Sequence, residues 1–181
     1  MRRLASLAVI LVLVAACGPG TTTPADVTPD PQTASAQSGR FTVTFTVDRT
    51  TLRTGDSVTG HADLSVIAGN SGLLSGPNEI FTFEFVEVGG QQRRALPASD
   101  DLCAPHQIGL DSPLTTPIYK SSGVAGDADP NAAFLREFLP GEAIHLPAGE
   151  WDITAIAGFV DGRACAGQPF SIRTTVRVHV S

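Results

Sequence analysis

The clearest periodic pattern in the chain is Phe41-Thr42-Val43-Thr44-Phe45-Thr46-Val47. Large apolar side chains occupy every second position, and threonine occupies the positions between them. Because successive side chains of a β-strand point to opposite faces, this alternation predicts a strand with one buried face and one solvated face. Its β-branched and aromatic residues also favour strands over helices.

The same period of two recurs along the rest of the chain. It predicts further strands over residues 58–66, 80–88, 142–146, 151–159 and 170–180. Phe81, Phe83 and Phe85 share one face of the strand at 80–88, and we expect that face to form core rather than a ligand groove. Gly89-Gly90 predicts a two-residue hairpin turn, since glycine readily takes positive φ, with residues 91–96 as the returning strand.

The middle of the chain lacks this regularity. Residues 97–133 contain Pro97, Pro105, Pro113, Pro117 and Pro130 as breakers. We expect a long loop excursion there, with a short strand near Ile118-Tyr119. Residues 134–139 fit a helical turn and a strand equally well.

Residues 40–181 have the size of one domain. About seven strands with frequent turn signals and no long helical pattern predict an all-β, antiparallel β-sandwich. Within it, Leu146-Pro147-Ala148-Gly149-Glu150-Trp151-Asp152-Ile153-Thr154-Ala155 resembles the turn and strand "L-P-A-G-x-[YW]-x-[VI]-T-A" near the end of bacterial immunoglobulin-like domains. The resemblance implies an immunoglobulin-like fold and no activity.

The N-terminus has the order of an export signal. Met1-Arg2-Arg3 precedes an apolar run from Leu4 to Ala16, which is shorter than the roughly 20 residues of a membrane-spanning helix. Val14-Ala15-Ala16-Cys17 ends the run and resembles the lipobox of bacterial lipoprotein signal peptides.

This resemblance implies a signal peptide at residues 1–16 and a diacylglycerol on the sulfur of Cys17. Two or three acyl chains hold a protein on a bilayer stably, whereas one chain binds only marginally. We therefore expect a cell-envelope protein, anchored to the outer face of the cytoplasmic membrane or, where there are two membranes, to the outer one. The lipid bilayer is then its first partner.

Residues 17–39 follow the lipobox and are rich in proline and threonine. Large apolar residues are almost missing from this segment, so it has little surface to bury against the entropy of ordering. We expect a disordered, semi-extended tether.

Cys103 and Cys165 remain once Cys17 is assigned to lipid. An even pair outside the cytoplasm predicts one disulfide, which would connect the 97–133 excursion to the loop before the last strand. The alternative is a copper-handling protein, since Cys103-Ala104-Pro105-His106 has the C-x-x-H spacing of a metal ligand pair and would need another histidine.

Charge and motifs exclude several other classes. The chain has 12 Lys and Arg against 18 Asp and Glu, and removal of Arg2 and Arg3 leaves 10 against 18, or −8. This balance argues against nucleic acid as a partner. No hydrolase, zinc or phosphate-loop motif is present, and His61, His145 and His179 fall on solvent sides of expected strands. Asp127-Ala128-Asp129-Pro130-Asn131 begins like a calcium loop, but Ala132 and Phe138 replace the required Gly and Glu.

We therefore expect a non-catalytic binding or scaffold module without a cofactor, displayed on a lipid anchor to an unknown protein or envelope ligand. The expected contact surface is the 97–133 excursion with the Cys165 loop, because long loops on a rigid scaffold often carry function. An alternative is an inhibitor or accessory protein of a secreted enzyme, with Ser121-Ser122-Gly123-Val124-Ala125-Gly126 as a bait loop.

Overall fold

Two β-sheets pack face to face in a computed structural model of the chain, which describes residues 31–69, 72–98, 102–123, 126 and 128–181. The smaller sheet has the strand order β1 (Gln32–Ser38), β2 (Phe41–Val47), β4 (Gly60–Val66) and β9 (Leu114–Pro117). The larger sheet runs β3 (Thr51–Leu52), β11 (Gln168–Val180), β10 (Gly149–Asp161), β5 (Gly72–Gly76) and β8 (Ala104–Ile108). Beside β5, β6 (Phe81–Glu87) also pairs with β10, and β7 (Arg94–Ala95) pairs with β6. This is the all-β, sandwich-like arrangement that the alternating patterns predict.

Aromatic side chains join the two sheets. Phe41 of β2 contacts Phe159 of β10, with ring centroids 4.9 Å apart, and Phe45 lies 5.9 Å from Phe83 of β6. All four rings are buried. Residues of β2 and β6 alternate strictly between buried and half-buried, and those of β4 do so from His61 onward, so the period of two in the sequence corresponds to the core face of each strand.

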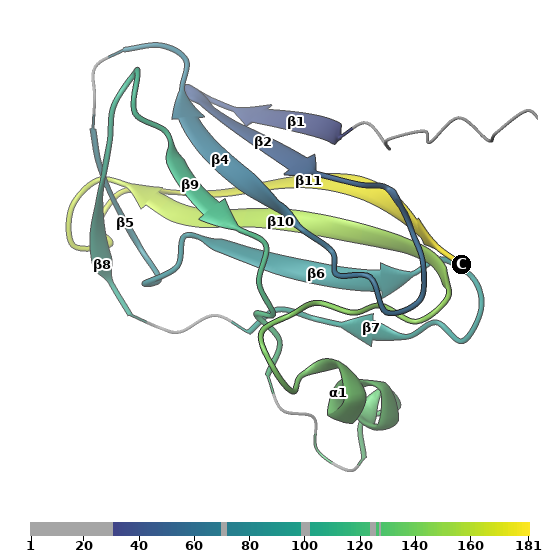
Figure 1. Ribbon diagram of the computed structural model, residues 1–181. Coiled ribbons are helices and arrows are strands. Elements are labelled where there is room, and N and C mark those ends of the chain that lie inside the picture. Colours follow the sequence, from purple (N-terminus) through teal and green to yellow (C-terminus); the bar gives the residue numbers. More distant parts are fainter. Residues whose placement is uncertain (1–30, 70–71, 99–101, 124–125, 127) are drawn as a thin grey trace, which may run out of the picture.

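β10 and β11 form the longest hairpin and the spine of the larger sheet (Figure 1). The two strands pair over their whole lengths, from Gly149 opposite Val180 to Asp161 opposite Gln168. On the other edge of β10, the first half pairs with β6 and the last residues pair with β5. One long strand therefore carries two shorter ones end to end.

The helix α1 (Ala132–Phe138) lies beside β7 at the edge of the molecule opposite β1 (Figure 1). Its Phe138 contacts Phe85 at 5.1 Å, and its Phe134 contacts Trp151 at 5.4 Å. The sequence pattern of residues 134–139 fits a helix and a strand equally well. These contacts explain why the segment is helical, because one helical turn places both rings against the core.

The expected tether is partly wrong. Residues 17–30 lie outside the described residues, but Gln32–Ser38 is strand β1, paired with β2 over seven positions. In this strand Ala34 and Ala36 alternate with polar residues, and the two alanines pack against the core. Side chains add to the backbone ladder, as Thr33 shares a hydrogen bond of 2.9 Å with Thr46 and Ser35 donates one of 3.2 Å to Thr44.

The long loop expected at 97–133 is also wrong in part, because it contributes a strand to each sheet. β8 pairs with β5 in the larger sheet and β9 pairs with β4 in the smaller one. Pro105 is tolerated in β8 because β8 is the last strand of its sheet among the described residues. The short strand was expected near Ile118-Tyr119, whereas β9 ends at Pro117.

Three further expectations need correction. The described residues hold eleven strands, several of them only two to five residues long, rather than about seven. The turn after β6 is wider than Gly89-Gly90, because the Glu87 N–H donates to the Arg93 carbonyl and only Arg94–Ala95 return as strand. Residues 142–146 form no strand; Ile144 and Leu146 are buried as their spacing predicts, but only His145 forms a bridge, to Ser57.

Candidate functional site

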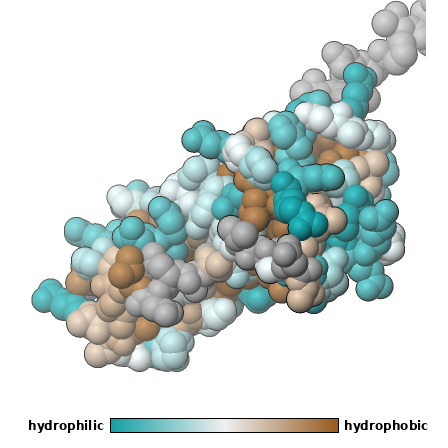
Figure 2. All heavy atoms as spheres, turned by 90° about the horizontal axis from the view of Figure 1, so that it is seen from below, coloured by the Kyte–Doolittle hydropathy of each residue, from teal (hydrophilic) through white to brown (hydrophobic). Residues whose placement is uncertain are grey.

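Four adjoining hollows surround α1, and we call the surface that they form the α1 face. Their volumes are about 170, 460, 240 and 340 Å³. Asn131 lines the first three, and Phe134, Glu137 and Pro147 line both of the last two. Figure 2 views the molecule from the side that carries α1 and shows apolar residues there in small groups bordered by hydrophilic ones.

An ion pair under the α1 face holds the β6–β7 turn in place. The Arg93 guanidinium donates to both carboxylate oxygens of Glu87, at 2.7 and 3.1 Å, and the backbone N–H groups of Gln91 and Arg93 donate to the same carboxylate. The Glu87 side chain is only 5% exposed. The hydrogen bond from Arg93 holds the pKa of Glu87 below its ordinary value, against the opposing effect of burial.

Arg93 also ties this turn to β10. Its guanidinium lies over the Trp151 ring, 5.3 Å from the centroid, and donates to the Ala148 carbonyl at 3.1 Å. The Trp151 indole N–H donates to the Pro147 carbonyl at 2.9 Å. One wall of the α1 face is therefore the turn Leu146-Pro147-Ala148-Gly149, which opens the stretch that resembles bacterial immunoglobulin-like domains.

Two polar residues join the start of α1 to β7. The Asn131 side-chain oxygen accepts a hydrogen bond of 3.0 Å from the Arg94 N–H. Asp129 Oδ1 accepts from the Asn131 backbone N–H at 2.7 Å and from its side-chain amide at 3.3 Å. At the other end of the helix, the Lys120 ammonium donates to the carbonyls of Pro140 and Gly141 and lies 5.3 Å from the Phe138 ring centroid. Burial lowers the pKa of Lys120.

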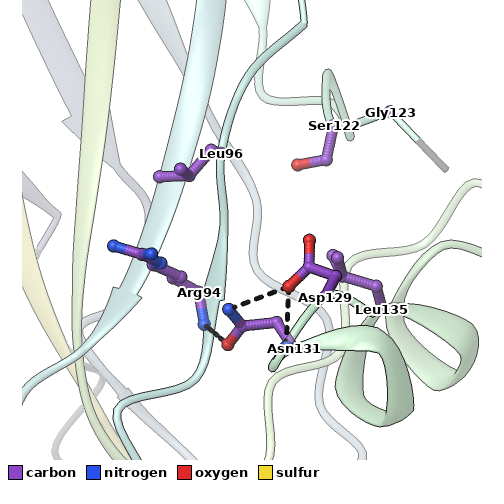
Figure 3. A pocket seen from close by; sticks show the side chains of 7 residues that line it. All are labelled: Arg94, Leu96, Ser122, Gly123, Asp129, Asn131 and Leu135. Atoms are coloured by element: carbon purple, nitrogen blue, oxygen red, sulfur yellow. Dashed lines mark hydrogen bonds between the residues drawn. The ribbon is translucent and has the colours of Figure 1, made fainter. Parts of the chain in front are cut away.

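The smallest hollow lies between β7 and its continuation on one side and residues 122–123 and 129–135 on the other (Figure 3). Its lining residues are Arg94, Leu96, Ser122, Gly123, Asp129, Asn131 and Leu135. The Ser122 hydroxyl oxygen is buried and, within the described part of the chain, has no hydrogen-bond partner.

The predicted cysteine pair is present, because the sulfurs of Cys103 and Cys165 are joined at 2.09 Å. The loop that carries Cys165 is bound to β5, where Ser75 Oγ donates to the Gly162 carbonyl and accepts from the Cys165 N–H. This end of the sheet, at the β10–β11 turn, lies away from α1 (Figure 1). The expected contact surface is therefore divided. Residues near Cys103 accompany the Cys165 loop, whereas Ser122, Gly123 and residues 129–131 line the α1 face.

The other predicted site residues do not form a metal centre. Cys103 is in the disulfide and so lacks the thiolate that copper would need. The histidines lie on separate elements, and His106 bonds the Pro77 carbonyl at 2.8 Å. Among the described residues, no group of three or more metal-ligating side chains is found.

The remaining loop motifs have structural partners where they are described. Asp127 of the calcium-like motif lies outside the described residues, and Asp129 bonds Asn131. In the expected bait loop, Ser121 is buried: its hydroxyl donates to the Phe83 carbonyl and accepts from the Phe83 N–H, both at 2.8 Å. The backbone of Ser122 forms an isolated antiparallel β-bridge with Pro97. Cys17, the expected lipid site, precedes the described residues.

Sequence reasoning missed Glu87, Arg93 and Asn131 as organisers of a surface. The one available signal was the departure of Glu87 from the apolar–polar alternation, which places a carboxylate on the buried face of β6. A buried carboxylate requires a partner, and the nearest downstream cation is Arg93.

The described part of the chain has no helix with the length and apolar character needed to cross a membrane. Comparisons with protein-family models, curated proteins and solved structures give no match to this chain.

Proposed function

We propose that this chain is a cell-envelope lipoprotein, held in the membrane through Cys17, that presents a non-catalytic, immunoglobulin-like domain for binding a partner at the α1 face. The observation that carries the proposal is the gathering of four hollows around one short helix that is fixed on both sides. Binding sites are usually concave surfaces in which a few polar groups converge at fixed positions.

The position of β1 supports the direction of display. The lipobox precedes β1 in the chain, and β1 and α1 lie at opposite edges of the molecule (Figure 1). An anchor that enters through β1 therefore leaves the α1 face turned away from the membrane. Because β1 is part of the domain, residues 17–31 form the connection, and they span about 50 Å at full extension.

The ion pair beneath the α1 face supports a binding role. The buried carboxylate of Glu87 is fully engaged by Arg93 and by backbone N–H groups, so it is not available as a general base. The ion pair instead gives the groove a fixed wall, which lowers the entropy cost of binding.

Photocrosslinking in intact cells tests the proposal. A photoreactive amino acid is placed at Gln91, which is exposed and lines two of the hollows, and at the exposed Gln37 on β1 as the matched control. We expect a discrete crosslinked product from position 91 and none from position 37. The same products from both positions, or none from either, would contradict the α1 face as the binding surface.

A further inference from the structure

The smallest hollow of the α1 face carries a more specific inference, which deepens the proposed function by naming the chemistry of the partner. The cavity measures about 170 Å³ and is lined by both polar and apolar side chains. It lies beside β7 and Leu96, between two contacts: the Arg94 N–H donates to Asn131, and the Ala98 N–H donates to the Ser121 carbonyl at 2.7 Å.

The first observation is the Ser122 hydroxyl. Its oxygen is buried, and no group in the described part of the chain bonds it. Buried hydroxyls nearly always have a partner, so an unpaired one that lines a cavity indicates a missing ligand or water. Figure 3 shows this oxygen directed into the space between Leu96 and Asp129.

The second observation is Asp129. Its Oδ1 accepts both hydrogen bonds from Asn131. Figure 3 shows the other carboxylate oxygen directed toward the Ser122 side of the cavity. Two acceptor oxygens on separate segments, one of them charged, therefore face the same small space.

The walls between these acceptors are apolar. Leu96 is 45% exposed although its neighbour Ala95 is buried, and Leu135 of α1 is buried on the other side. The remaining charged residue of the lining is Arg94, and Figure 3 shows its guanidinium directed away from Ser122 and Asp129. The cationic side chain thus leaves the acceptors accessible.

We propose that this cavity binds the alkylammonium end of a lysine side chain from a partner protein. An ammonium group has three donors and no acceptor, which matches a hydroxyl oxygen and a carboxylate oxygen. The four-carbon stem of lysine can pack against the apolar side chains of Leu96 and Leu135 while its charged end reaches the polar groups. The net charge of −8 after removal of Arg2 and Arg3 favours the approach of a basic partner.

Ligand analogues on the full chain in a neutral detergent test this inference. The probe is Nα-acetyl-lysine N-methylamide, followed by backbone amide NMR shifts. Its controls are the norleucine analogue, which keeps the stem and lacks the ammonium, and the arginine analogue, which is larger and planar. We expect saturable shifts at Gly123, Asp129 and Leu135 with the lysine probe, and at least fivefold weaker binding of both controls.

Two variants assign the acceptors. Asp129→Asn keeps the oxygen that bonds Asn131 and removes the charge, and we expect about tenfold weaker binding of the probe. Ser122→Ala removes a hydroxyl that has no bond in the free chain, so we expect weaker binding with an unchanged or raised Tm. Asp111→Asn, at an exposed aspartate outside the cavity, is the matched control and should bind as the parent does.

Three results would overturn the inference: equal shifts from the norleucine analogue, lysine binding that survives Asp129→Asn, or a lowered Tm in Ser122→Ala, which would show that the hydroxyl is already satisfied. None of these bears on crosslinking at Gln91, so a failure here is distinguishable from a failure of the proposed function.

Discussion

Glu87 shows how a single residue shapes the α1 face. It occupies a core-facing position of β6, where an apolar side chain would fit the alternation, and it is paired there with an Arg93 side chain that is 19% exposed. Replacing one partner of a buried ion pair leaves the other without compensation, and this cost exceeds the net contribution of the intact pair.

Glu87→Gln should lower the free energy of unfolding by about 2 kcal/mol at neutral pH, less than for a fully buried pair because Arg93 reaches solvent. Chemical denaturation measures this. The control is Glu150→Gln, since the Glu150 side chain is 45% exposed and pairs with His179 at the surface; its loss should cost below about 1 kcal/mol. Equal effects of the two substitutions would contradict the role given to Glu87.

The pH dependence of stability has a definite sign. The folded pKa of Glu87 lies below the value of 4.5 for the free side chain, so the folded state binds fewer protons than the unfolded state between these two values. The stabilisation is complete above pH 4.5 and is lost as the pH falls through the folded pKa. The stability gap between parent and Glu87→Gln should therefore narrow in acid, and a constant gap would contradict the ion pair.

At the scale of elements, β1 is the one whose stability depends most on pairing and least on burial. Its side chains are half-buried or exposed, and its ladder with β2 begins at a two-residue turn in which Gly39 has φ of +58°. Alternate N–H groups of an antiparallel edge strand point to the neighbour and to solvent. The Ser38–Phe41 pair closes the turn. Counting back from it, the N–H of Gln37 points outward and the N–H of Ala36 points toward β2.

Ala36→Pro should therefore lower the free energy of unfolding by about 1–2 kcal/mol, through the lost ladder bond and the distorted strand. Gln37→Pro, one residue away, should cost much less because it removes an N–H that faces solvent. Hydrogen exchange of the β2 amides distinguishes the two variants: exchange accelerates in the first and is nearly unchanged in the second. The reverse order would show that β1 is not paired in this register.

Strands with long uniform alternation could be predicted from sequence, and strands defined by their neighbours could not. β2, β6, β10 and β11 follow their periodic patterns closely. β5 has only two apolar residues, Leu73 and Leu74, in a glycine- and serine-rich stretch, and it is ordered by pairing with β8 and β10.

The α1 face lay beyond sequence reasoning for a related reason. Its polar groups come from the turn after β6, from Ser122 and from the start of α1, and no spacing within the chain relates them. The cysteine pair could be predicted from chemistry alone, because an even pair of cysteines in a chain expected outside the cytoplasm favours a disulfide, and the fold brings the two together.

For the molecule as a whole, the disulfide connects residues 62 positions apart and ties the chain before β8 to the β10–β11 turn. In the chain-entropy model, closing a loop of this length in the unfolded chain stabilises the folded state by about 4 kcal/mol. The double variant Cys103→Ala, Cys165→Ala should lose about 2–4 kcal/mol of unfolding free energy. A reductant should destabilise the parent equally and leave the double variant unchanged; a reductant without effect on the parent would show that the bond is absent in the isolated protein.

The proposed function depends most on membrane attachment through Cys17, because attachment would set the compartment, favour pairing of Cys103 with Cys165 and give the α1 face its outward direction. Cys17→Ala should release the chain from the membrane fraction, whereas Cys103→Ala, Cys165→Ala should remain bound. Continued membrane association of Cys17→Ala would place the anchor elsewhere.

The most direct test is the intact mass of the chain extracted from cell membranes. We expect a polypeptide that begins at Cys17 and carries the mass of a diacylglycerol, with or without a further acyl chain, and that gains two hydrogens only on reduction. A chain that retains Met1, or one that begins at another residue and carries no lipid, would contradict it.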